Sequence, residues 1–200
     1  MRLLGLDKNC FSNWCEKLPG GTTMVVQPKI EGCSIGLRYK YGQLVDAYSR
    51  ENPGIIEIIR TISTIPLIID DSLKVEVELE GVLYSPGFSS KFSKEQSILN
   101  LRNPINIKEP LSFLAFQIFA SKSDELSDLT QLQKWGFEVP ITLRTEDPRQ
   151  VKIWHTQWIN NELFSNFPTN GIVAKCNSSS TKDFLGVTSS APNWALALTR

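Results

Sequence analysis

The stretch "VVQPKIEGCSIGLRY", residues 25–39, decides how the rest of this chain is interpreted. Its β-branched run ends at Gln27, Pro28 and Lys29, and a carboxylate and a glycine follow before an alternating pattern resumes. This composition predicts two strands joined by a turn, with a lysine where the first strand stops. Either Lys29 is a solvated residue of a hairpin, or it is a nucleophile. An isolated K-x-E-G favours the first interpretation, so the other motifs must decide.

Length, composition and charge exclude several classes of protein. The chain has 200 residues, 41% of them hydrophobic and 21% charged, which is typical of one globular domain, expected here over residues 1–200. Lys+Arg and Asp+Glu number 21 each, which argues against a chain that holds DNA unaided. No apolar run has membrane-spanning length and the start lacks a signal-peptide pattern, so a cytoplasmic location without membrane contact is expected.

Cysteine and histidine usage gives no sign of a metal centre or a hydrolase. The cysteines at positions 10, 15, 33 and 176 have no zinc-binding spacing, which predicts reduced thiols and no metal ligands. The single histidine, His155, lies in a helical pattern, where a packing or surface role is expected. The sequence has neither a P-loop nor a G-x-G-x-x-G motif.

Hydrophobic periodicity predicts an α+β fold with antiparallel strands. Strands are expected over residues 24–30, 33–49 (two, joined at Lys40–Gly42), 72–84, 111–120, 170–177 and 193–199. Helices are expected within 54–65, 121–137 and 146–161. The second has Ser123 or Asp124 as its cap and Gly136 beyond its C-terminus, and the third has Asp147 as its cap and Pro148 at its first position. The segment "CNSSSTKDF", residues 176–184, is expected to be a loop. Antiparallel strands with segregated helices define the α+β class.

Four charged residues lie within these strands or at their ends. Lys29 and Arg50 each stand at the end of a strand, Glu80 lies on the polar face of "VEVELEG", and Lys175 lies in "NGIVAK". A nucleophilic lysine, a carboxylate and a second lysine suit nucleotidyl transfer, in which an amine attacks the α-phosphorus of a nucleotide. The amine must be neutral at that moment, which desolvation and neighbouring cations favour. A second cation then stabilises the charge that develops on the phosphate.

An ordered series of motifs covers nearly the whole chain and resembles one known family. "PKIEGCSIGLRYKYGQLVDAYSR" resembles "PKxDGxAxxLxYxxGxLxxAxTR", "VEVELEGVLYSPGF" resembles "LEVRGEVFxxxxxF", "NLRN" resembles "NPRN" and "EPLSFLAFQI" resembles "RPLxFFAYGx". "NGIVAK" resembles "DGVVIK", and "LGVTSSAPNWALA" resembles "LGxTSRAPRWAIA". Together these motifs resemble the adenylation domain of bacterial NAD-dependent DNA ligases. The match of "IIRTISTIPL" to "NVRTIxxIPL" points to the NAD-type rather than the ATP-type ligases.

The resemblance implies a fold, an activity and cofactors. The fold would be the nucleotidyltransferase fold of DNA ligases and mRNA capping enzymes, which is ATP-grasp-like, with two antiparallel sheets flanked by helices. The activity would be that of an NAD-dependent DNA ligase-like adenylyltransferase, which forms a covalent lysyl-AMP at Lys29 as the first step of nick joining in DNA replication and repair. NAD would supply the AMP moiety, with ATP as the alternative donor, and Mg²⁺ would assist.

The resemblance also assigns roles to individual residues. Lys29 and Lys175 would be catalytic. Gln27 stands where the family usually has a glutamate that contacts adenine, Phe116 would stack on the base, and Glu80 would bind the ribose. Arg50 and Arg102 would join Lys175 around the phosphates.

Three positions depart from the family's pattern. Asn170 stands in place of an aspartate, and Thr199 in place of a lysine that contacts the α-phosphate. Arg200 comes one position later, and side-chain alternation along a strand predicts that it lies on the opposite face. Loss of a phosphate-facing cation can slow a transfer reaction by ~10²–10³.

Several parts of the family's longer members have no counterpart in this sequence. The nicotinamide-binding subdomain, OB-fold, zinc module, helix-hairpin-helix repeats and BRCT domain are not found. The expected partners are therefore an adenine nucleotide, and nicked DNA only weakly or with a partner protein. Complete nick sealing by this chain alone is not expected.

Three hypotheses remain after the sequence has been considered. The first is an adenylyltransferase that forms lysyl-AMP at Lys29. The second is a catalytically impaired relative that acts as a nucleotide-binding or protein-interaction module, which Asn170 and Thr199 favour. The third is ATP-dependent end joining of RNA or DNA, against which the "RTISTIPL" match argues. The position of Arg200 discriminates between the first two, since a cation that reaches the phosphates would favour an enzyme.

Overall fold

The structure is a computed structural model that describes residues 6, 11–50, 52, 54–70, 75–86, 110–189 and 191–200. The chain forms two compact units. Unit 1 comprises residues 1–3, 31–121 and 128–140, and unit 2 comprises residues 4–30, 122–127 and 141–200. Each unit contains one four-stranded antiparallel sheet, which confirms the predicted α+β class with two antiparallel sheets. The expectation of one domain over residues 1–200 stays a prediction.

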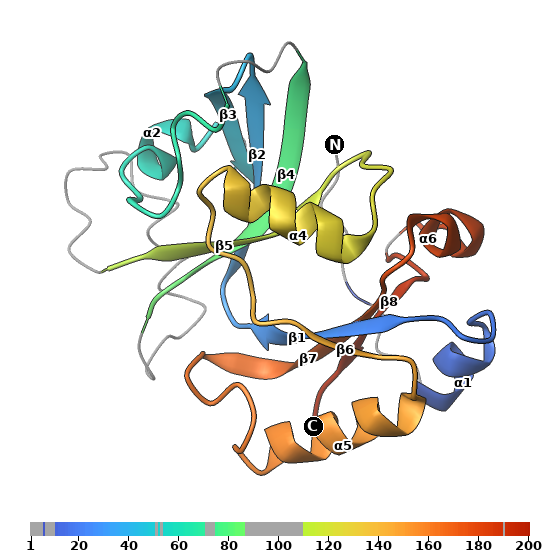
Figure 1. The fold of residues 1–200 in the computed structure, drawn as a ribbon. Helices are drawn as coiled ribbons and strands as arrows, with labels where there is room; N and C mark the ends of the chain where they lie inside the picture. Colours follow the sequence, from blue (N-terminus) through green and yellow to red (C-terminus); the bar gives the residue numbers. More distant parts are fainter. Residues whose placement is uncertain are drawn as a thin grey trace. The chain divides into compact units, whose positions relative to one another are not determined.

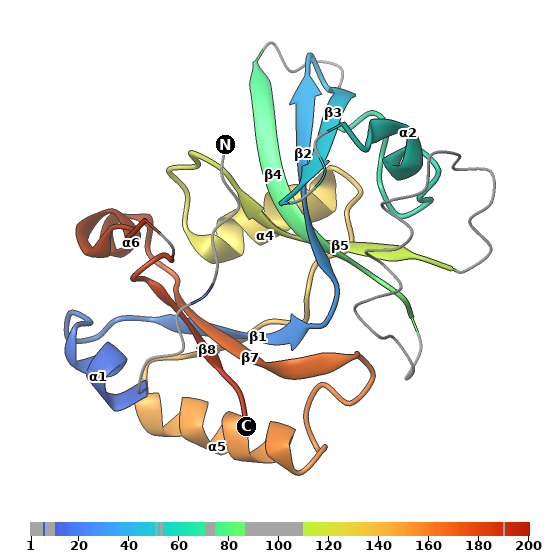
Figure 2. The same cartoon turned by 180° about the vertical axis from the view of Figure 1, so that it is seen from behind.

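The sheet of unit 2 has the strand order β6-β1-β7-β8 (Figure 1). Its strands are β1 (Met24–Ile30), β6 (Leu143–Thr145), β7 (Thr169–Cys176) and β8 (Ala195–Leu198). The helices of this unit are α1 (Phe11–Glu16), α5 (Pro148–Ile159) and α6 (Ser179–Leu185). Figure 2 shows α5 along β7, which it contacts.

One face of this sheet carries the core of unit 2. Alternate residues of β1, β7 and β8 pack with apolar side chains of α1 and α5. The buried members are Phe11, Trp14, Met24, Val26, Val151, Trp158, Phe164, Ile172, Ala174, Cys176, Leu196 and Leu198. The intervening residues of the same strands, among them Gln27, Lys29 and Lys175, therefore belong to the opposite face.

The sheet of unit 1 has the strand order β3-β2-β4-β5. Its strands are β2 (Cys33–Lys40), β3 (Gln43–Ser49), β4 (Glu76–Tyr84) and β5 (Ser112–Ile118). Among the described residues, its helices are α2 (Ile56–Ile59) and the part of α4 (Glu125–Lys134) from Asp128 onward. The core face carries buried side chains such as Leu37, Leu79 and Phe113. Phe137, which follows α4, packs edge-on against Tyr39 of this face with ring centroids 6.1 Å apart.

Close approaches within the sheets require glycine at several positions, among them Gly171 and Gly36. A Cβ on Gly171 would lie 2.4 Å from the carbonyl oxygen of Leu198, so only glycine lets β7 and β8 pair there. A Cβ on Gly36 would lie 2.3 Å from Cζ of Tyr48, because the tyrosine ring covers the backbone of β2 at this point.

Helix α6 was not predicted from the sequence, and the expectation of a loop over residues 176–184 is wrong. Serine disfavours helix interiors, but Ser178 caps the helix by accepting a hydrogen bond from the Thr181 amide at 3.4 Å. The predicted helix over 54–65 is also mostly wrong, since α2 spans only Ile56–Ile59 and turns with three-residue spacing follow it. The short elements α1 and β6 were not predicted either.

The predicted cap of α5 is confirmed. The Asp147 side chain accepts a hydrogen bond from the Arg149 amide at 2.9 Å, and Pro148 is the first residue of the helix. In the described part of the chain, no helix is both long enough and apolar enough to cross a membrane.

Candidate active site

A β-bulge in unit 2 brings Asn170 against Lys29. The register between β1 and β7 runs from Pro28 opposite Ile172 to Ile30 opposite Thr169, so β7 contains one extra residue opposite Lys29. The extra residue of a bulge shares the face of its neighbour, which places Asn170 beside the lysine. The Lys29 ammonium donates a hydrogen bond to Oδ1 of Asn170 at 2.5 Å.

Gln27 and Lys175 share the face of the sheet that carries Lys29. Gln27 precedes Lys29 by two residues on β1, and Lys175 lies opposite Val25, so strand alternation directs all three side chains to one face. Gln27 is buried with 2% of its surface exposed, and its amide nitrogen donates to Oγ1 of Thr142 at 3.0 Å. The structure therefore brings together Gln27, Lys29 and Lys175, three of the predicted site residues.

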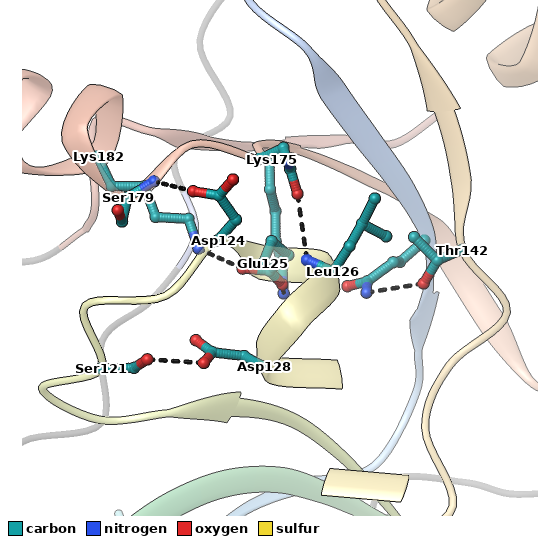
Figure 3. A network of polar contacts seen from close by, with 11 residues as sticks. Ser121, Asp124, Glu125, Leu126, Asp128, Thr142, Lys175, Ser179 and Lys182 are labelled. Atoms are coloured by element: carbon teal, nitrogen blue, oxygen red, sulfur yellow. Dashed lines mark hydrogen bonds and ion pairs between the residues drawn. The ribbon is translucent and has the colours of Figure 1, made fainter. Parts of the chain in front are cut away.

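Lys175 does not stand alone on this face, because its ammonium is bound to Glu125, the first residue of α4. The Lys175 Nζ lies 2.5 Å from Oε1 of Glu125, and the Nζ of Lys182 from α6 lies 2.5 Å from Oε2 (Figure 3). Burial alone would raise the pKa of the Glu125 carboxyl, but the charges and hydrogen bonds of the two lysines outweigh burial and hold that pKa below its usual value.

Sequence reasoning missed Glu125 and Lys182. A glutamate at the start of a helix satisfies the helix dipole and carries no other local signal. Lys182 lies in the segment expected to be a loop, and only the folding of α6 brings it to Glu125. Tertiary contacts between residues 50 and 57 positions apart join these groups.

Glu80 and Phe116 lie together on one face of the sheet of unit 1. The register between β4 and β5 shifts at Glu80, so that Phe116 and Gln117 both stand opposite it. This bulge places the half-buried Phe116 on the face of Glu80, a carboxylate that is 5% exposed. In a gapless comparison with "LEVRGEVF", Glu80 precedes the motif's glycine whereas the family's glutamate follows it, at the position of Val82. Positions 80 and 82 share one face, so a carboxylate remains there.

Arg50 and Tyr48 lie at the end of β3 in the same unit. Arg50 follows the last residue of the strand and is exposed. Tyr48 lies over Gly36 on the face of Glu80, and its pKa is raised to about 12 by burial and by the nearby charges of Glu78 and Glu80.

The predicted site residues are divided between the two units. Gln27, Lys29 and Lys175 belong to unit 2, and Arg50, Glu80 and Phe116 belong to unit 1. Arg102 lies outside the described residues. The roles of all seven as catalytic or nucleotide-binding residues remain predictions.

Arg200 does not take the place of the missing phosphate-facing lysine. Its guanidinium carbon lies 5.6 Å from the centre of the Trp158 ring, and its Nη2 donates to the carbonyl of Ile159 at 3.3 Å. Trp158 is part of the core on the α5 side of the sheet. The predicted orientation of Arg200 is therefore confirmed, since the side chain lies on the side of the sheet opposite to Lys29 and Lys175.

The described residues offer no protein-held metal site. No group of three or more His, Cys, Asp or Glu side chains among them could hold a metal ion. Cys15, Cys33 and Cys176 are free thiols. His155 packs as predicted, since its ring stacks on Trp158 and its Nε2 lies 3.2 Å from the carbonyl oxygen of Thr199.

Solved structures define the class of fold. The chain superposes with a TM-score of 0.65 and 11% identity on a structure titled "DNA binding with a minimal scaffold: Structure-function analysis of Lig E DNA ligases", covering 100% of this chain and 69% of that one. It superposes on an archaeal ATP-dependent RNA ligase with a TM-score of 0.62 and 12% identity, covering 99% of this chain and 48% of that one. The fold is that of the DNA and RNA ligase nucleotidyltransferases.

Sequence comparison then assigns the family. The family described as NAD-dependent DNA ligase adenylation domain matches residues 9–199, and this chain belongs to it. The chain is 31% identical over 217 residues to a DNA ligase of Borrelia turicatae, covering 92% of this chain and 32% of that protein. It is 27% identical over 202 residues to a DNA ligase of Halothermothrix orenii, covering 89% and 30%. The chain thus spans about a third of the length of the curated relatives it matches.

Proposed function

We propose that this chain is a ligase-type adenylyltransferase domain in which Lys29 accepts AMP from NAD. The lysyl-AMP would be the activated intermediate of the first step of DNA nick joining. Membership of the NAD-dependent ligase adenylation family supports NAD as the donor, although the relatives it matches are about three times longer. The later steps on DNA would belong to a longer assembly or a partner protein.

The observation that carries this proposal is the environment of Lys29 in unit 2. Its amine emerges at the end of β1, is held by the Asn170 side chain at 2.5 Å, and shares a sheet face with Gln27 and Lys175. The face thus presents a nucleophile, a buried amide suited to hydrogen bonding with a base, and a cation suited to a phosphate.

The transfer step follows from this arrangement. The lone pair of Lys29 Nζ attacks the α-phosphorus of NAD and forms a P–N bond. The bridging P–O bond breaks, and nicotinamide mononucleotide leaves with the electron pair, while Nζ loses its surplus proton to solvent. Asn170 orients the amine through one N–H, and Lys175 stabilises the charge that grows on the phosphate oxygens.

Mg²⁺ would be bound mainly by the phosphates of the donor. The described residues do not offer the acidic cluster that a protein-held ion needs, and the aspartate of the family's motif is Asn170 here. We therefore derive no step through a metal and assign it no ligand from this chain.

The test is to incubate the purified chain with NAD, and separately with ATP, in the presence of Mg²⁺, and to measure its intact mass. We expect one added AMP with NAD on wild type and none on Lys29→Ala. Lys29→Arg is the matched control, since it keeps the positive charge but cannot act as the nucleophile. An adduct that survives in Lys29→Ala, or no adduct with either donor, would contradict the proposal. An adduct with ATP alone would reassign the donor.

A second candidate function is supported by the position of Arg200. Arg200 lies against Trp158, and the Thr199 side chain is uncharged. The α-phosphate would therefore contact one positive group fewer than in the family. A chain that binds adenine nucleotide without transferring AMP would then act as a nucleotide-binding or protein-interaction module. Saturable binding of AMP together with the absence of any adduct would identify this case.

A further inference from the structure

Two lysines of unit 2 share a single buried carboxylate. Lys175 of β7 binds Oε1 of Glu125 and Lys182 of α6 binds Oε2, both at 2.5 Å, and the Glu125 side chain is only 4% exposed (Figure 3). One ammonium would be enough to compensate one carboxylate. Taken together, the side chains of Glu125, Lys175 and Lys182 therefore carry one more positive than negative charge. Neither Glu125 nor Lys182 has a part in the transfer step described above.

Backbone hydrogen bonds hold Glu125 and the helix of Lys182 in place. The Glu125 amide donates to the carbonyl of Asn177 at 2.8 Å, and the Ser179 amide at the start of α6 donates to Oδ1 of Asp124 at 2.9 Å. These contacts tie the first turn of α4 to the segment between β7 and α6. Of the two lysines, Lys175 is the one that rises from the sheet face shared with Lys29.

Lys182 lowers the free energy needed to move the Lys175 ammonium away from Glu125. If Lys175 were the only cation, its movement to a bound phosphate would leave a buried carboxylate without compensation, which is strongly unfavourable. With Lys182 present, the remaining pair of Glu125 and Lys182 is neutral. Lys182 also lies 4.9 Å from the centre of the Trp194 ring, a contact that stays when Lys175 moves.

We propose that Glu125 and Lys182 are positioning residues for Lys175. Glu125 holds the Lys175 ammonium when the site has no nucleotide, and Lys182 keeps Glu125 compensated when Lys175 turns to the phosphate of an adenine nucleotide. This inference rests on the proposed function only in taking Lys175 as a phosphate ligand, and it does not require that AMP be transferred.

The test combines two substitutions, of which the second should reverse the effect of the first on AMP affinity. Binding of AMP is measured by isothermal titration calorimetry for wild type, Lys182→Met, Glu125→Gln and the double variant. We expect Lys182→Met to weaken AMP affinity about tenfold, the scale of one hydrogen bond to a charged group, because Lys175 is then retained by Glu125. Adding Glu125→Gln should restore affinity to at least the wild-type level, because a neutral amide needs no compensating cation.

The double variant separates this role from simpler ones. If Lys182 contacted the phosphate directly, or served only the packing of α6, the double variant would bind AMP as weakly as Lys182→Met, and the proposal would be overturned. Lys182→Arg keeps the cation and should bind AMP like wild type. Circular dichroism verifies folding. Should Lys182→Met not fold, Glu125→Gln and the double variant must still bind AMP equally, and a loss in the double variant overturns the proposal.

The intact-mass assay with NAD distinguishes failure of the two proposals. AMP binding with the expected cancellation but without an adduct would overturn adenylyl transfer and leave the positioning role in place. An adduct without the cancellation would leave the transfer and overturn the positioning role. No binding of AMP and no adduct would overturn both.

Discussion

At the scale of single residues, Lys29 and Lys175 of unit 2 differ in the groups that they contact. Lys29 is half-buried and donates to the neutral amide of Asn170, whereas Lys175 is buried against the carboxylate of Glu125. The amide oxygen of Asn170 orients one N–H of Lys29, whereas the carboxylate of Glu125 holds the Lys175 ammonium in place. These surroundings suit Lys29 as a nucleophile and Lys175 as a cation for phosphate.

The last two residues of the chain give a prediction at this scale. Continued alternation from Ala195 and Ala197 directs Thr199 to the face of Lys175, whereas Arg200 lies against Trp158. Thr199→Lys should therefore raise the rate of AMP transfer to Lys29 by at least about tenfold, because it adds a phosphate-facing cation. The rate is measured from the growth of the adduct by mass spectrometry.

The matched control is Arg200→Lys, which places a lysine one position later. Its side chain should stay on the α5 side of the sheet and leave the transfer rate unchanged. Equal acceleration by both variants would show that the end of the chain does not keep the alternation of β8, and the argument would fail.

At the scale of elements, one buried carboxylate joins β7, α4 and α6. Lys175 and Lys182 lower the pKa of Glu125 below its ordinary value of about 4.5. The folded chain therefore binds the proton of this carboxyl less tightly than the unfolded chain does. The ion pairs consequently stabilise the fold above that ordinary value, and the stabilisation is lost as the pH falls through the folded pKa.

This linkage gives a prediction for the pH dependence of stability. Between about pH 5 and pH 3, the free energy of unfolding should fall more steeply for wild type than for Glu125→Gln. Urea denaturation at each pH measures the difference. Glu162→Gln, which removes an exposed carboxylate, should keep the steep dependence of wild type. Parallel curves for wild type and Glu125→Gln would mean that the carboxylate is not held by the lysines in solution.

At the scale of the whole molecule, charge and chain length bear on the interaction with DNA. Equal numbers of acidic and basic residues give a net charge of +0, and non-specific DNA binding depends on clustered cations that release counterions. The curated relatives are about three times longer than this chain. A domain without surplus positive charge has little electrostatic attraction to a duplex.

We therefore expect weak binding of nicked DNA by this chain alone. Fluorescence anisotropy with a labelled nicked duplex should show no saturation up to about 10 μM protein at about 150 mM salt, and little tightening at lower salt. An intact duplex of the same sequence is the control. Nanomolar binding that is specific for the nick would contradict this expectation and assign a DNA-binding surface to the chain.

Local patterns in the sequence were sufficient to assign the family, the α+β class and most strands. These features depend on local properties: the β-branched content of β1, the alternation of apolar residues in β4, the Asp147–Pro148 start of α5, and a series of short motifs in the order that the family shows. The motifs also identified Lys29 and Lys175 as candidates. Helix α6 was not predicted, because serine is unfavourable in helix interiors. In the folded chain, a cap and tertiary packing outweigh that preference.

The groups that surround the candidate residues could be identified only from the folded chain. The bulge that sets Asn170 against Lys29 depends on the register between β1 and β7, and the bulge that sets Phe116 beside Glu80 depends on the register between β4 and β5. The ion pairs of Glu125 join a helix start to residues that are 50 and 57 positions away. Register and long-range contact arise from packing over the whole sheet, so no local pattern encodes them.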